Sequence, residues 1–563
     1  MNGQASSEDF DFVVVGSGSG SMCAALVLRA AGKSVLIVEK TALVGGTTAI
    51  SGGVMWIPAN RYMKEAGIAD SAEQALRYLD AVVGNRADQP GTSPARRRAY
   101  VEQAPRMLDF LVAQGIRLRR IPSWPDYSDA PGASVPGRTV VSELFDAKQL
   151  GEWQNKLRPG FLPLPAHLDE AMQLPLFKRS WPAKKVLFRI IGRAIADKLR
   201  GRQRVTAGQA LQAQMLHAAV KAGVRIEVNA PVKSLLVESG RVCGVIAERD
   251  GAEWRVHARH GVLLNAGGFA RNQAMLDRYI PGTSASWSST IDGDTGEMIE
   301  AAASLGAATA QMGERIGMQI AWPPGSEAMM VKAAMQNDIN KPHAIVVDNS
   351  GLRYARESSS HPEFSERMIE RQRQHPEMKS WMVFDSQYLA KYMLAGTMPG
   401  AKKPKVWGET KFLRQADTLA ALATDCGIDA ARLKATVARY NGFVARGRDE
   451  DFGRGDSAYD HWVGDPLHTP SNTLGAIERA PFYAVQIYPG DVGTYGGLVT
   501  DEHARVLRAD GSVIDGLYAT GTSAASVMGS VEPGAGGSIG PAFTWGYVAA
   551  LHALGGGQGR AAA

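Results

Sequence analysis

DFVVVGSGSGS, residues Asp11–Ser21, is the stretch that decides the fold of this 563-residue chain. Its apolar run leads into a glycine turn and a segment rich in small residues. Further along, a second apolar run, Ser34–Val38, ends in the acid Glu39. A strand, a glycine turn, a helix and a second strand that ends in an acid form the βαβ unit that binds an adenine dinucleotide. The sequence therefore predicts an α/β fold with a Rossmann-like domain.

The positions of this turn have roles that chemistry explains. Gly16 permits the tight turn, and Gly18 lets the backbone approach the pyrophosphate, which then meets the N–H groups at the start of the helix. Glu39 is expected to accept hydrogen bonds from the ribose hydroxyls. The third glycine of the usual fingerprint falls on Ser21, with Gly20 beside it. The predicted nucleotide contacts are Gly16, Ser17, Gly18, Gly20, Ser21 and Glu39.

The loop after Glu39 favours FAD as the dinucleotide. Residues 40–53 hold two glycine pairs separated by hydroxyl residues. Their amides and hydroxyls suit a loop that wraps the ribityl chain and the flavin edge. The predicted contacts in this loop are Lys40, Gly45, Gly46, Thr47, Thr48, Ser51, Gly52 and Gly53.

Later segments are expected to return the chain to the cofactor. Val262–Phe269 is a buried strand that runs into a Gly-Gly turn, and Gly516–Thr522 repeats this pattern before the glycine-rich Glu532–Gly540. The last segment opens a predicted helix, so its N–H groups are expected to face the flavin pyrimidine carbonyls. The predicted contacts are Val232, Ala266, Gly267, Gly268, Gly521, Glu532, Gly534, Gly537, Ser538 and Ile539.

The length of the chain and a change in composition along it predict two domains. Residues 1–280 and 481–563 carry the cofactor signals and are expected to form a FAD-binding domain that is split in the sequence. Residues 281–480 are richer in tryptophan, proline and methionine and end in long helical periods. We expect them to form an inserted α+β catalytic cap, with the ligand bound in the cleft between the domains.

Composition narrows the class of protein. Hydrophobic residues make up 45% and charged residues 21%, as in a soluble α/β protein. The three cysteines, Cys23, Cys243 and Cys426, show no pairing or metal-ligand spacing, so we predict a reducing compartment and no metal site. No apolar run is long enough to span a membrane and the N-terminal residues are polar, so we expect a cytoplasmic protein.

The net charge of +6 is mild, but residues 177–204 concentrate basic side chains around the single acid Asp197. Large apolar residues alternate with them, which is typical of an amphipathic helix that lies on an anionic membrane surface. An ordinary helix that packs its apolar face on the protein gives the same pattern, and both interpretations stay open. No nucleic-acid-binding motif accompanies the charge, so we expect no nucleic-acid partner.

The order of these clusters resembles the fumarate reductase and 3-ketosteroid dehydrogenase superfamily of flavoproteins. Several segments resemble the 3-ketosteroid Δ1-dehydrogenase branch in particular, and they are spread over essentially the whole chain. They are Val14–Gly18, Gly45–Gly53, Asp126–Tyr127 with Pro136–Arg138, Pro481–Val485 with Tyr488–Thr494, and Pro533–Gly536. The resemblance implies an FAD-dependent dehydrogenase.

The substrate is expected to be an uncharged, largely apolar ketone. The dicarboxylate enzymes of this superfamily bind the carboxylates of their substrates with arginines and with the histidine of a His-Thr-x-Gly-Gly run. The corresponding run here, Gly493–Gly497, has glycine in place of that histidine, and the Pro533–Gly540 loop holds no arginine. A buried carboxylate without a partner is very costly. Candidate walls of the pocket are Trp124, Tyr127, Trp287, Met318, Trp322 and Met330.

The resemblance also implies catalytic groups. A saturated ketone gives up hydride from its β-carbon only if a base takes the α-proton while donors hold the ketone oxygen. The expected donors are Tyr488 and the backbone N–H of Gly493. The family's base tyrosine follows a Glu-Ser pair, and His361 stands in its place here. A neutral imidazole is a competent base near pH 7. Tyr127 resembles the family's auxiliary tyrosine and either hydrogen-bonds His361 or replaces it as the base.

The leading prediction is an FAD-dependent enzyme that introduces the Δ1 double bond into a 3-ketosteroid or a similar alicyclic ketone and passes electrons to a quinone-like acceptor. Two enzymatic alternatives stay open, Δ4-(5α) dehydrogenation and an ene reductase that runs the reaction in reverse. A flavin-binding electron carrier that associates with membranes through residues 178–204 is an alternative of another class.

Overall fold

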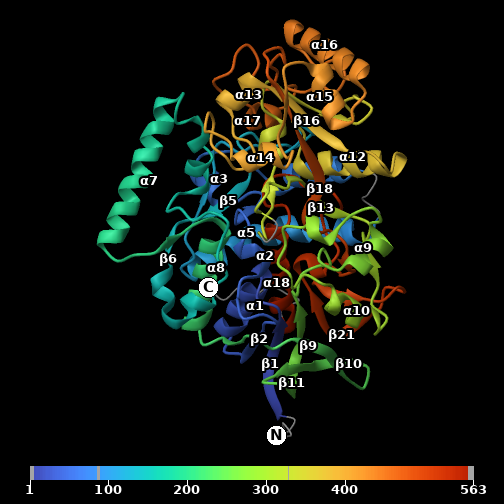
Figure 1. Cartoon of the computed structure of the whole chain (residues 1–563). Coiled ribbons are helices and arrows are strands. Elements are labelled where there is room, and N and C mark those ends of the chain that lie inside the picture. The colour runs from blue at the N-terminus through green and yellow to red at the C-terminus, as the bar shows by residue number, and fades with distance from the viewer. Residues whose placement is uncertain (1–5, 85–88, 327–328, 556–563) are drawn as a thin grey trace.

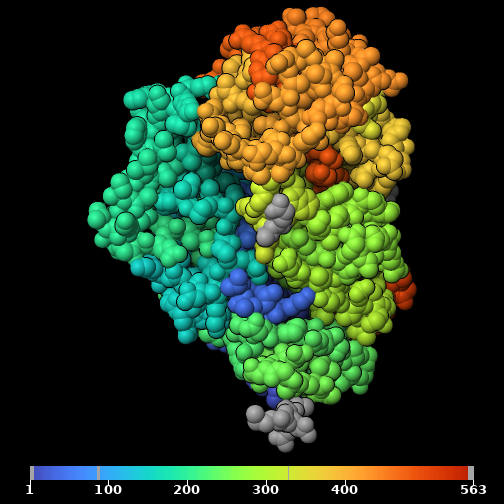
Figure 2. All heavy atoms as spheres, in the orientation of Figure 1, coloured from blue at the N-terminus to red at the C-terminus, as the bar shows by residue number. Residues whose placement is uncertain are grey.

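Two β-sheets organise the computed structural model, which describes residues 6–84, 89–326 and 329–555 (Figure 1). The larger sheet lies in the lower half of the view and the smaller sheet in the upper half. In the space-filling view the later residues of the insert, coloured yellow to orange, cover the upper end of the molecule (Figure 2). Within the described ranges, no helix combines the length and the apolar content needed to cross a membrane.

The larger sheet has eight strands, with β11 and β1 at its centre. β1 pairs in parallel with β2 and β11, β2 with β8, and β11 with β21, while the remaining pairs are antiparallel. The strands are β1 (Ser6–Val15), β2 (Val35–Val38), β8 (Arg225–Glu227), β9 (Val232–Glu238), β10 (Arg241–Arg249), β11 (Ala252–Leu264), β20 (Arg505–Leu507) and β21 (Val513–Ala519).

Both faces of this sheet are covered, which explains why β1 is apolar without interruption. Phe12 and Val14 pack into one hydrophobic core and Val13 and Val15 into another, as the period of two along a strand requires. The first core is closed by α1 (Ser19–Ala30), α4 (Ala72–Val83), α5 (Pro94–Ala113), α8 (Ala207–Lys221) and α18 (Ile539–Ala553). The second is closed by α9 (Gln273–Tyr279) and α10 (Glu297–Ala303).

The smaller sheet has six strands and only antiparallel pairs. One face packs against α12 (His361–Gln374), and the other against α15 (Leu419–Cys426) and α16 (Ala430–Arg446). Its strands are β13 (Arg315–Ala321), β14 (Ala333–Ala334), β15 (Ala344–Asp348), β16 (Ser380–Asp385), β17 (Arg414–Ala416) and β18 (Phe482–Thr494).

The structure confirms the predicted α/β architecture with an inserted α+β unit, but it moves one boundary. We expected the FAD-binding domain to resume at residue 481, whereas β18 pairs with β13, β16 and β17 of the smaller sheet. The chain rejoins the larger sheet only after Thr494, at β20 and β21. The apolar pattern of β18 marks it as a buried strand, and such a pattern does not say which sheet the strand joins.

The remaining elements surround the two sheets. β3 (Val54–Trp56), β4 (Leu118–Arg120) and β5 (Thr139–Ser142) form a three-stranded sheet. Helix α7 (Trp181–Leu199) stands at the side of the molecule (Figure 1). Short elements complete the fold: α2 (Gly46–Ala49), α3 (Arg61–Glu65), β6 (Phe145–Asp146), α6 (Leu168–Ala171), β7 (Arg204–Val205), β12 (Thr309–Ala310), α11 (Gln336–Ile339), α13 (Ser386–Lys391), α14 (Lys405–Glu409), α17 (Ala458–Val463) and β19 (Gly497–Leu498).

Candidate active site

A cavity of about 1270 Å³ joins the glycine turn after β1 to the inserted unit. At one end it is lined by Gly16–Gly18, by the acid after β2 and by the start of α18. At the other end it is lined by Met318 of β13, the first residue of α12, and residues of α17. Segments far apart in the sequence therefore build one continuous chamber.

The glycine end of the cavity fits the phosphates and the flavin of FAD. Gly16 has a φ of +93°, which favours glycine, and a Cβ there would lie 2.3 Å from the carbonyl oxygen of Asn265. The N-cap of α1 is Gly18 and that of α18 is Ser538, and neither caps its helix with a side-chain hydrogen bond. The first N–H groups of a helix have no acceptor within the helix, so both helix starts can bind an acceptor held in the cavity.

Glu39 is fixed at the end of β2. One carboxylate oxygen accepts from the N–H and the hydroxyl of Ser17, at 3.1 and 2.5 Å, and the other accepts from the N–H and the hydroxyl of Thr41, at 2.9 and 2.8 Å. The side chain lines the cavity and is almost fully buried. Its contact with a ribose stays a prediction.

Most of the predicted cofactor contacts line this cavity. The structure brings together there Gly16, Ser17, Gly18, Glu39, Lys40, Gly46, Thr47, Thr48, Ser51, Gly52, Val232, Ala266, Gly267, Gly521, Glu532, Ser538 and Ile539.

Seven predicted contacts do not line the cavity, and six of them are glycines at which an added Cβ would lie within 3 Å of a neighbouring atom. A Cβ on Gly20 would lie 2.5 Å from the carbonyl oxygen of Ala542 in α18. A Cβ on Gly53 would meet the backbone of Ala207 at 2.5 Å. These glycines allow segments to approach one another, which a pattern of glycines in the sequence does not separate from ligand binding. The seven are Gly20, Ser21, Gly45, Gly53, Gly268, Gly534 and Gly537.

His361 lies in the cavity as the first residue of α12 and is held on three sides. Its Nδ1 is 2.7 Å from the carbonyl oxygen of Gly317, and its own carbonyl accepts from Nε2 of Gln319 at 2.8 Å. Its Nε2 is 3.2 Å from Oε2 of Glu532. Burial lowers the pKa of His361, but attraction and hydrogen bonding to Glu532 and the bond to Gly317 outweigh it, so the pKa lies above the ordinary 6.5.

Tyr127 and Tyr459 bring two phenols to the same part of the cavity. Their ring centroids are 4.5 Å apart, and the ring of Tyr127 is 6.3 Å from that of His361. No described residue hydrogen-bonds to either phenol oxygen, so the expected bond between Tyr127 and His361 is absent. Burial raises the pKa of Tyr127 well above 10, which makes this phenol a poor base and a good hydrogen-bond donor.

The loop that carries Glu532 is tied to Tyr127. The N–H of Tyr127 donates to the carbonyl oxygen of Pro533 at 3.0 Å, and the hydroxyl of Tyr78 donates to the same oxygen at 2.6 Å. Further along this loop, Gly536 lines the cavity with a φ of +96°, and its N–H has no acceptor among the described residues. The loop therefore presents a carboxylate and an unused backbone donor to the same space.

The structure does not bring Tyr488 and Gly493 together on the cavity wall. The ring of Tyr488 packs against Trp287 and Trp322, at centroid distances of 5.6 and 6.5 Å, and Tyr488 is not among the residues that line the cavity. Gly493 does line it. The resemblance of the Tyr488–Thr494 segment located the right strand, β18, without its side-chain directions.

The apolar wall differs in part from the expected one. Trp124, Tyr127 and Met318 line the cavity, whereas Trp287, Trp322 and Met330 do not. The sequence did not single out Tyr459 or Trp462 of α17, yet Trp462 stacks on Trp124 with ring centroids 4.5 Å apart. Only the fold brings these two tryptophans together, since they lie far apart in the sequence.

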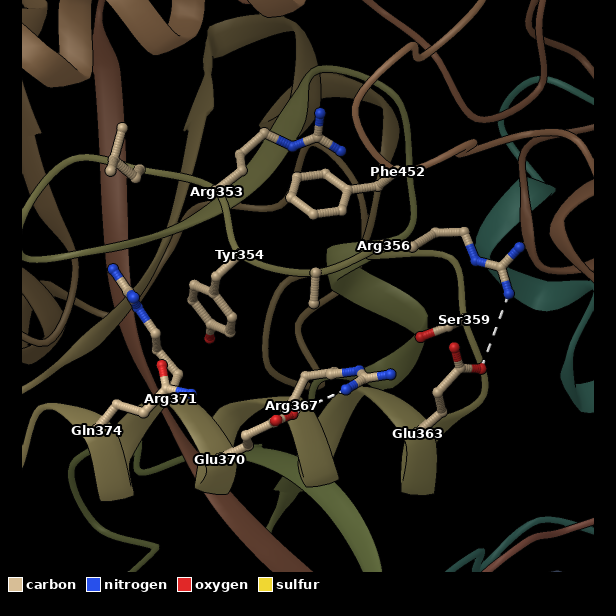
Figure 3. Close-up of a pocket in the computed structure, with 12 residues that line it drawn as sticks. Arg353, Tyr354, Arg356, Ser359, Glu363, Arg367, Glu370, Arg371, Gln374 and Phe452 are labelled. Atoms are coloured by element: carbon tan, nitrogen blue, oxygen red, sulfur yellow. Dashed lines mark hydrogen bonds and ion pairs between the residues drawn. The ribbon is translucent and has the colours of Figure 1, made fainter. Parts of the chain in front are cut away.

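A second pocket, of about 670 Å³, lies beside α12 and is lined by four arginines (Figure 3). Each arginine pairs with an acid: Arg353 with Glu357 and Asp449, Arg356 with Glu363, Arg367 with Glu370, and Arg371 with Asp348. Because these positive charges are already matched, the pocket is explained as an ion-pair network that joins α12 to its neighbours.

The spacing of the cysteines indicated no metal site, and the fold reveals one grouping that spacing cannot show. Glu238, Cys243 and His257 lie on neighbouring strands with potential ligand atoms within 4.8 Å of one another. They are partly exposed and lie outside the large cavity.

Comparison with known proteins identifies the family of the chain. Residues 11–539 match the model of a family described as FAD binding domain. The chain is 38% identical to a 3-oxosteroid 1-dehydrogenase of Mycobacterium tuberculosis, over 97% of this chain and 98% of the relative. It is 33% identical to a 4-oxocyclohexanecarboxylate 2-dehydrogenase of Sinomonas cyclohexanicum, over 96% and 92% of the two chains.

A solved structure is similar to this chain over nearly its whole length. The 3-ketosteroid Δ1-dehydrogenase of Sterolibacterium denitrificans, in complex with 1,4-androstadiene-3,17-dione, superimposes with a TM-score of 0.90 at 36% identity, over 97% of this chain and 99% of that chain. The protein therefore belongs to the FAD-binding oxidoreductase family that includes the 3-oxosteroid 1-dehydrogenases, and its cofactor is FAD.

Proposed function

We propose that this protein introduces a double bond between the α- and β-carbons of a 3-oxosteroid, at ring position 1. One observation carries the proposal: a single cavity connects the FAD-binding turn to a buried histidine–glutamate pair and two unpartnered phenols. The relatives named 3-oxosteroid 1-dehydrogenase support the choice of ketone and of ring position.

The lining of the cavity suits a neutral ring system. Trp124, Trp462 and Met318 supply apolar surface. Lys341 also lines it, but its ammonium donates to the carbonyl oxygens of Val463 and Gly464 and is thereby satisfied. A carboxylated substrate would therefore have to compete for that cation.

The side chains and the cofactor have separate roles in removing a proton and a hydride from two adjacent carbons. FAD, when bound, supplies the oxidant that takes hydride from the β-carbon. The phenols of Tyr127 and Tyr459 and the N–H of Gly536 are donors for the ketone oxygen, where negative charge develops when the α-proton leaves. The His361–Glu532 pair is the proton acceptor. Burial of all these groups excludes water, which strengthens each hydrogen bond to the developing charge.

Anaerobic mixing of the purified holoenzyme with 4-androstene-3,17-dione tests this function. Loss of the oxidised flavin absorbance, with a product two mass units lighter that carries the new double bond at position 1, is the expected result. A product with the new bond at position 4 after mixing with a saturated 3-oxosteroid would instead favour the Δ4-(5α) alternative. Oxidation of reduced enzyme by the unsaturated ketone alone would favour an ene reductase. Unbleached flavin with every ring ketone would exclude the proposal.

Contact with a membrane and a quinone-like electron acceptor are part of the same proposal. Helix α7 leaves large apolar side chains open to solvent: Trp181 is 63%, Phe188 65%, Ile195 56% and Leu199 82% exposed. Its opposite face, including Ile190, packs on the protein. Basic residues flank the exposed apolar side chains, so the complementary surface is an anionic bilayer, where a lipid-soluble quinone is also found.

Flotation with vesicles tests the role of α7. Vesicles that contain phosphatidylglycerol are expected to carry the enzyme, and phosphatidylcholine vesicles are not. Phe188→Ser with Leu199→Ser should abolish flotation without changing flavin bleaching by the steroid. Val220→Ser, at a 37% exposed apolar residue on α8, is the control. Equal flotation of both variants would exclude α7 as the contact.

A further inference from the structure

His361 and Glu532 form a buried ion pair in the part of the cavity that also holds the phenols of Tyr127 and Tyr459. The side chains of His361 and Glu532 are 12% and 6% exposed. His361 belongs to the inserted unit and Glu532 to the loop before α18. Within the described part of the chain, no other hydrogen bond or ion pair engages the Glu532 carboxylate.

The protons that the pair must carry determine which of its atoms can act as a base. A backbone carbonyl only accepts hydrogen bonds, so Nδ1 of His361 must carry a proton to bond with Gly317. The opposite nitrogen, Nε2, is 3.2 Å from Oε2 of Glu532. Two lone pairs would repel each other at that distance, so one proton lies between the two atoms. The pair thus holds a single shared proton, and Nε2 has no lone pair to offer a substrate.

We propose that Glu532, rather than His361, accepts the α-proton of the ketone, and that His361 is the residue that positions it. This inference rests on the proposed function. The carboxylate has a second oxygen, Oε1, which keeps its lone pairs while Oε2 is bonded to the imidazolium. Glu532 lines the cavity, so this oxygen is available there.

The proton step balances within the chain's own groups. The bond between the α-carbon and its hydrogen breaks, the proton goes to Oε1 of Glu532, and a carboxylic acid forms. The electron pair left on the α-carbon moves toward the ketone oxygen, where Tyr127, Tyr459 and the N–H of Gly536 are the donors. FAD, when bound, would supply the oxidant for the matching hydride of the β-carbon.

The surroundings favour the ion-paired form of the dyad. The pKa of His361 is raised although burial alone would lower it, which keeps the imidazole protonated beside Glu532. The hydrogen bond from Gln319 to the main chain of His361 and that from the ring to Gly317 fix the imidazolium from one strand, β13. A fixed cation next to the carboxylate sets the direction in which its free oxygen points.

Hydrogen exchange separates proton removal from oxidation and tests the proposal. The holoenzyme is incubated anaerobically in D₂O with a mixture of two steroids. The first is 1,4-androstadiene-3,17-dione, which already carries the double bond at position 1, and the second is 4-androstene-3,17-dione, which does not. Deuterium next to the ring A ketone of the second compound is measured by mass spectrometry and NMR. Glu532→Gln keeps the size of the side chain and removes the base, and is expected to slow exchange by about 10²- to 10⁴-fold. Glu532→Asp should recover part of the rate.

His361→Gln and Glu363→Gln complete the design. His361→Gln keeps the carboxylate, so it should retain exchange well above Glu532→Gln while its pH profile shifts. Glu363→Gln lies on α12 outside the large cavity, pairs with Arg356, and should exchange like the parent. Flavin content and circular dichroism establish that each variant is folded.

The outcomes are distinct. Exchange lost in His361→Gln but kept within a few fold in Glu532→Gln would make His361 the base and overturn the inference. If the parent enzyme neither bleaches nor exchanges with any ring ketone, the proposed function itself fails. Bleaching in the parent together with loss of exchange in Glu532→Gln supports both.

Discussion

Arg138 and Asp70 form a bidentate ion pair from which solvent is almost completely excluded. Nε and Nη2 of Arg138 donate to the two carboxylate oxygens at 2.9 and 2.7 Å, and the side chains are 0% and 1% exposed. The remaining nitrogen of the guanidinium donates to Asp126, which also accepts from the indole N–H of Trp56 at 2.8 Å. Since Tyr127 follows Asp126 in the chain, this buried cluster holds one of the proposed donors in its place.

Arg138→Met is expected to destabilise the protein by about 3–5 kcal/mol, because it leaves two buried carboxylates without their cation. Urea denaturation measures the change. Arg61→Met is the control, since the Arg61–Glu65 pair is 41% and 58% exposed and such pairs contribute about 1 kcal/mol or less. Similar losses in both variants would contradict the assignment.

Gly20→Ala should destabilise the fold by about 1–3 kcal/mol, because its Cβ would press on Ala542 where α1 meets α18. The effect is expected on the melting temperature, with FAD retained by the folded fraction. Gly192 lies in the interior of α7, and a Cβ added there would meet nothing within 4 Å, so Gly192→Ala should stabilise that helix slightly. Loss of FAD from folded Gly20→Ala protein would restore Gly20 as a cofactor contact.

Tyr127→Phe and Tyr459→Phe should each lower kcat by about 10²- to 10³-fold with little change in KM, because each removes a donor needed chiefly when charge develops on the ketone oxygen. Tyr488→Phe should change kcat far less, since Tyr488 packs against Trp287 outside the cavity. Steady-state kinetics of the three variants decides between the two sets of donors. A large loss in Tyr488→Phe alone would return the role of donor to Tyr488.

The imidazole of His361 should titrate above pH 6.5 in the folded protein, because of Glu532 and the bond to Gly317. A raised pKa means that this group's contribution to stability is complete below pH 6.5 and is lost as the pH rises through the folded-state pKa. Glu532→Gln removes the attracting charge and leaves burial, so the pKa of His361 should fall. Glu532 is the charged group whose attraction raises this pKa, and Tyr127 is the other titratable ring in contact with the imidazole. NMR of labelled histidine measures both values, and an unchanged pKa in the variant would contradict the pairing.

The features that could be predicted from the sequence are those whose interacting residues lie close together along the chain. The turn from Gly16 to Glu39 is local, because strand, turn and acid follow one another, and the structure places Gly16, Gly18 and Glu39 on the cavity wall. Gly20 and Gly53 belong to the same pattern of glycines, but their reason is contact with segments that are distant in the sequence.

The catalytic end of the site was harder to predict for the same reason. His361 was found by its place after a Glu-Ser pair, and the structure puts it in the cavity. Its partner Glu532 was expected to contact the cofactor, since nothing local says that this carboxylate meets an imidazole from another unit. For Tyr488 the matching segment identifies the strand, but the register with Ile320 and the packing on Trp287 decide where the side chain goes.

The bond between the ring of His361 and Gly317 links the reactive pair to the strand that forms the apolar wall, since Met318 follows Gly317 on β13. A substrate that displaces β13 outward would move the imidazolium of His361 away from Glu532. On the proposed mechanism, a ring system too wide for this wall would therefore weaken the base before the ketone loses its α-proton, so selection among ketones would act on turnover as well as on affinity.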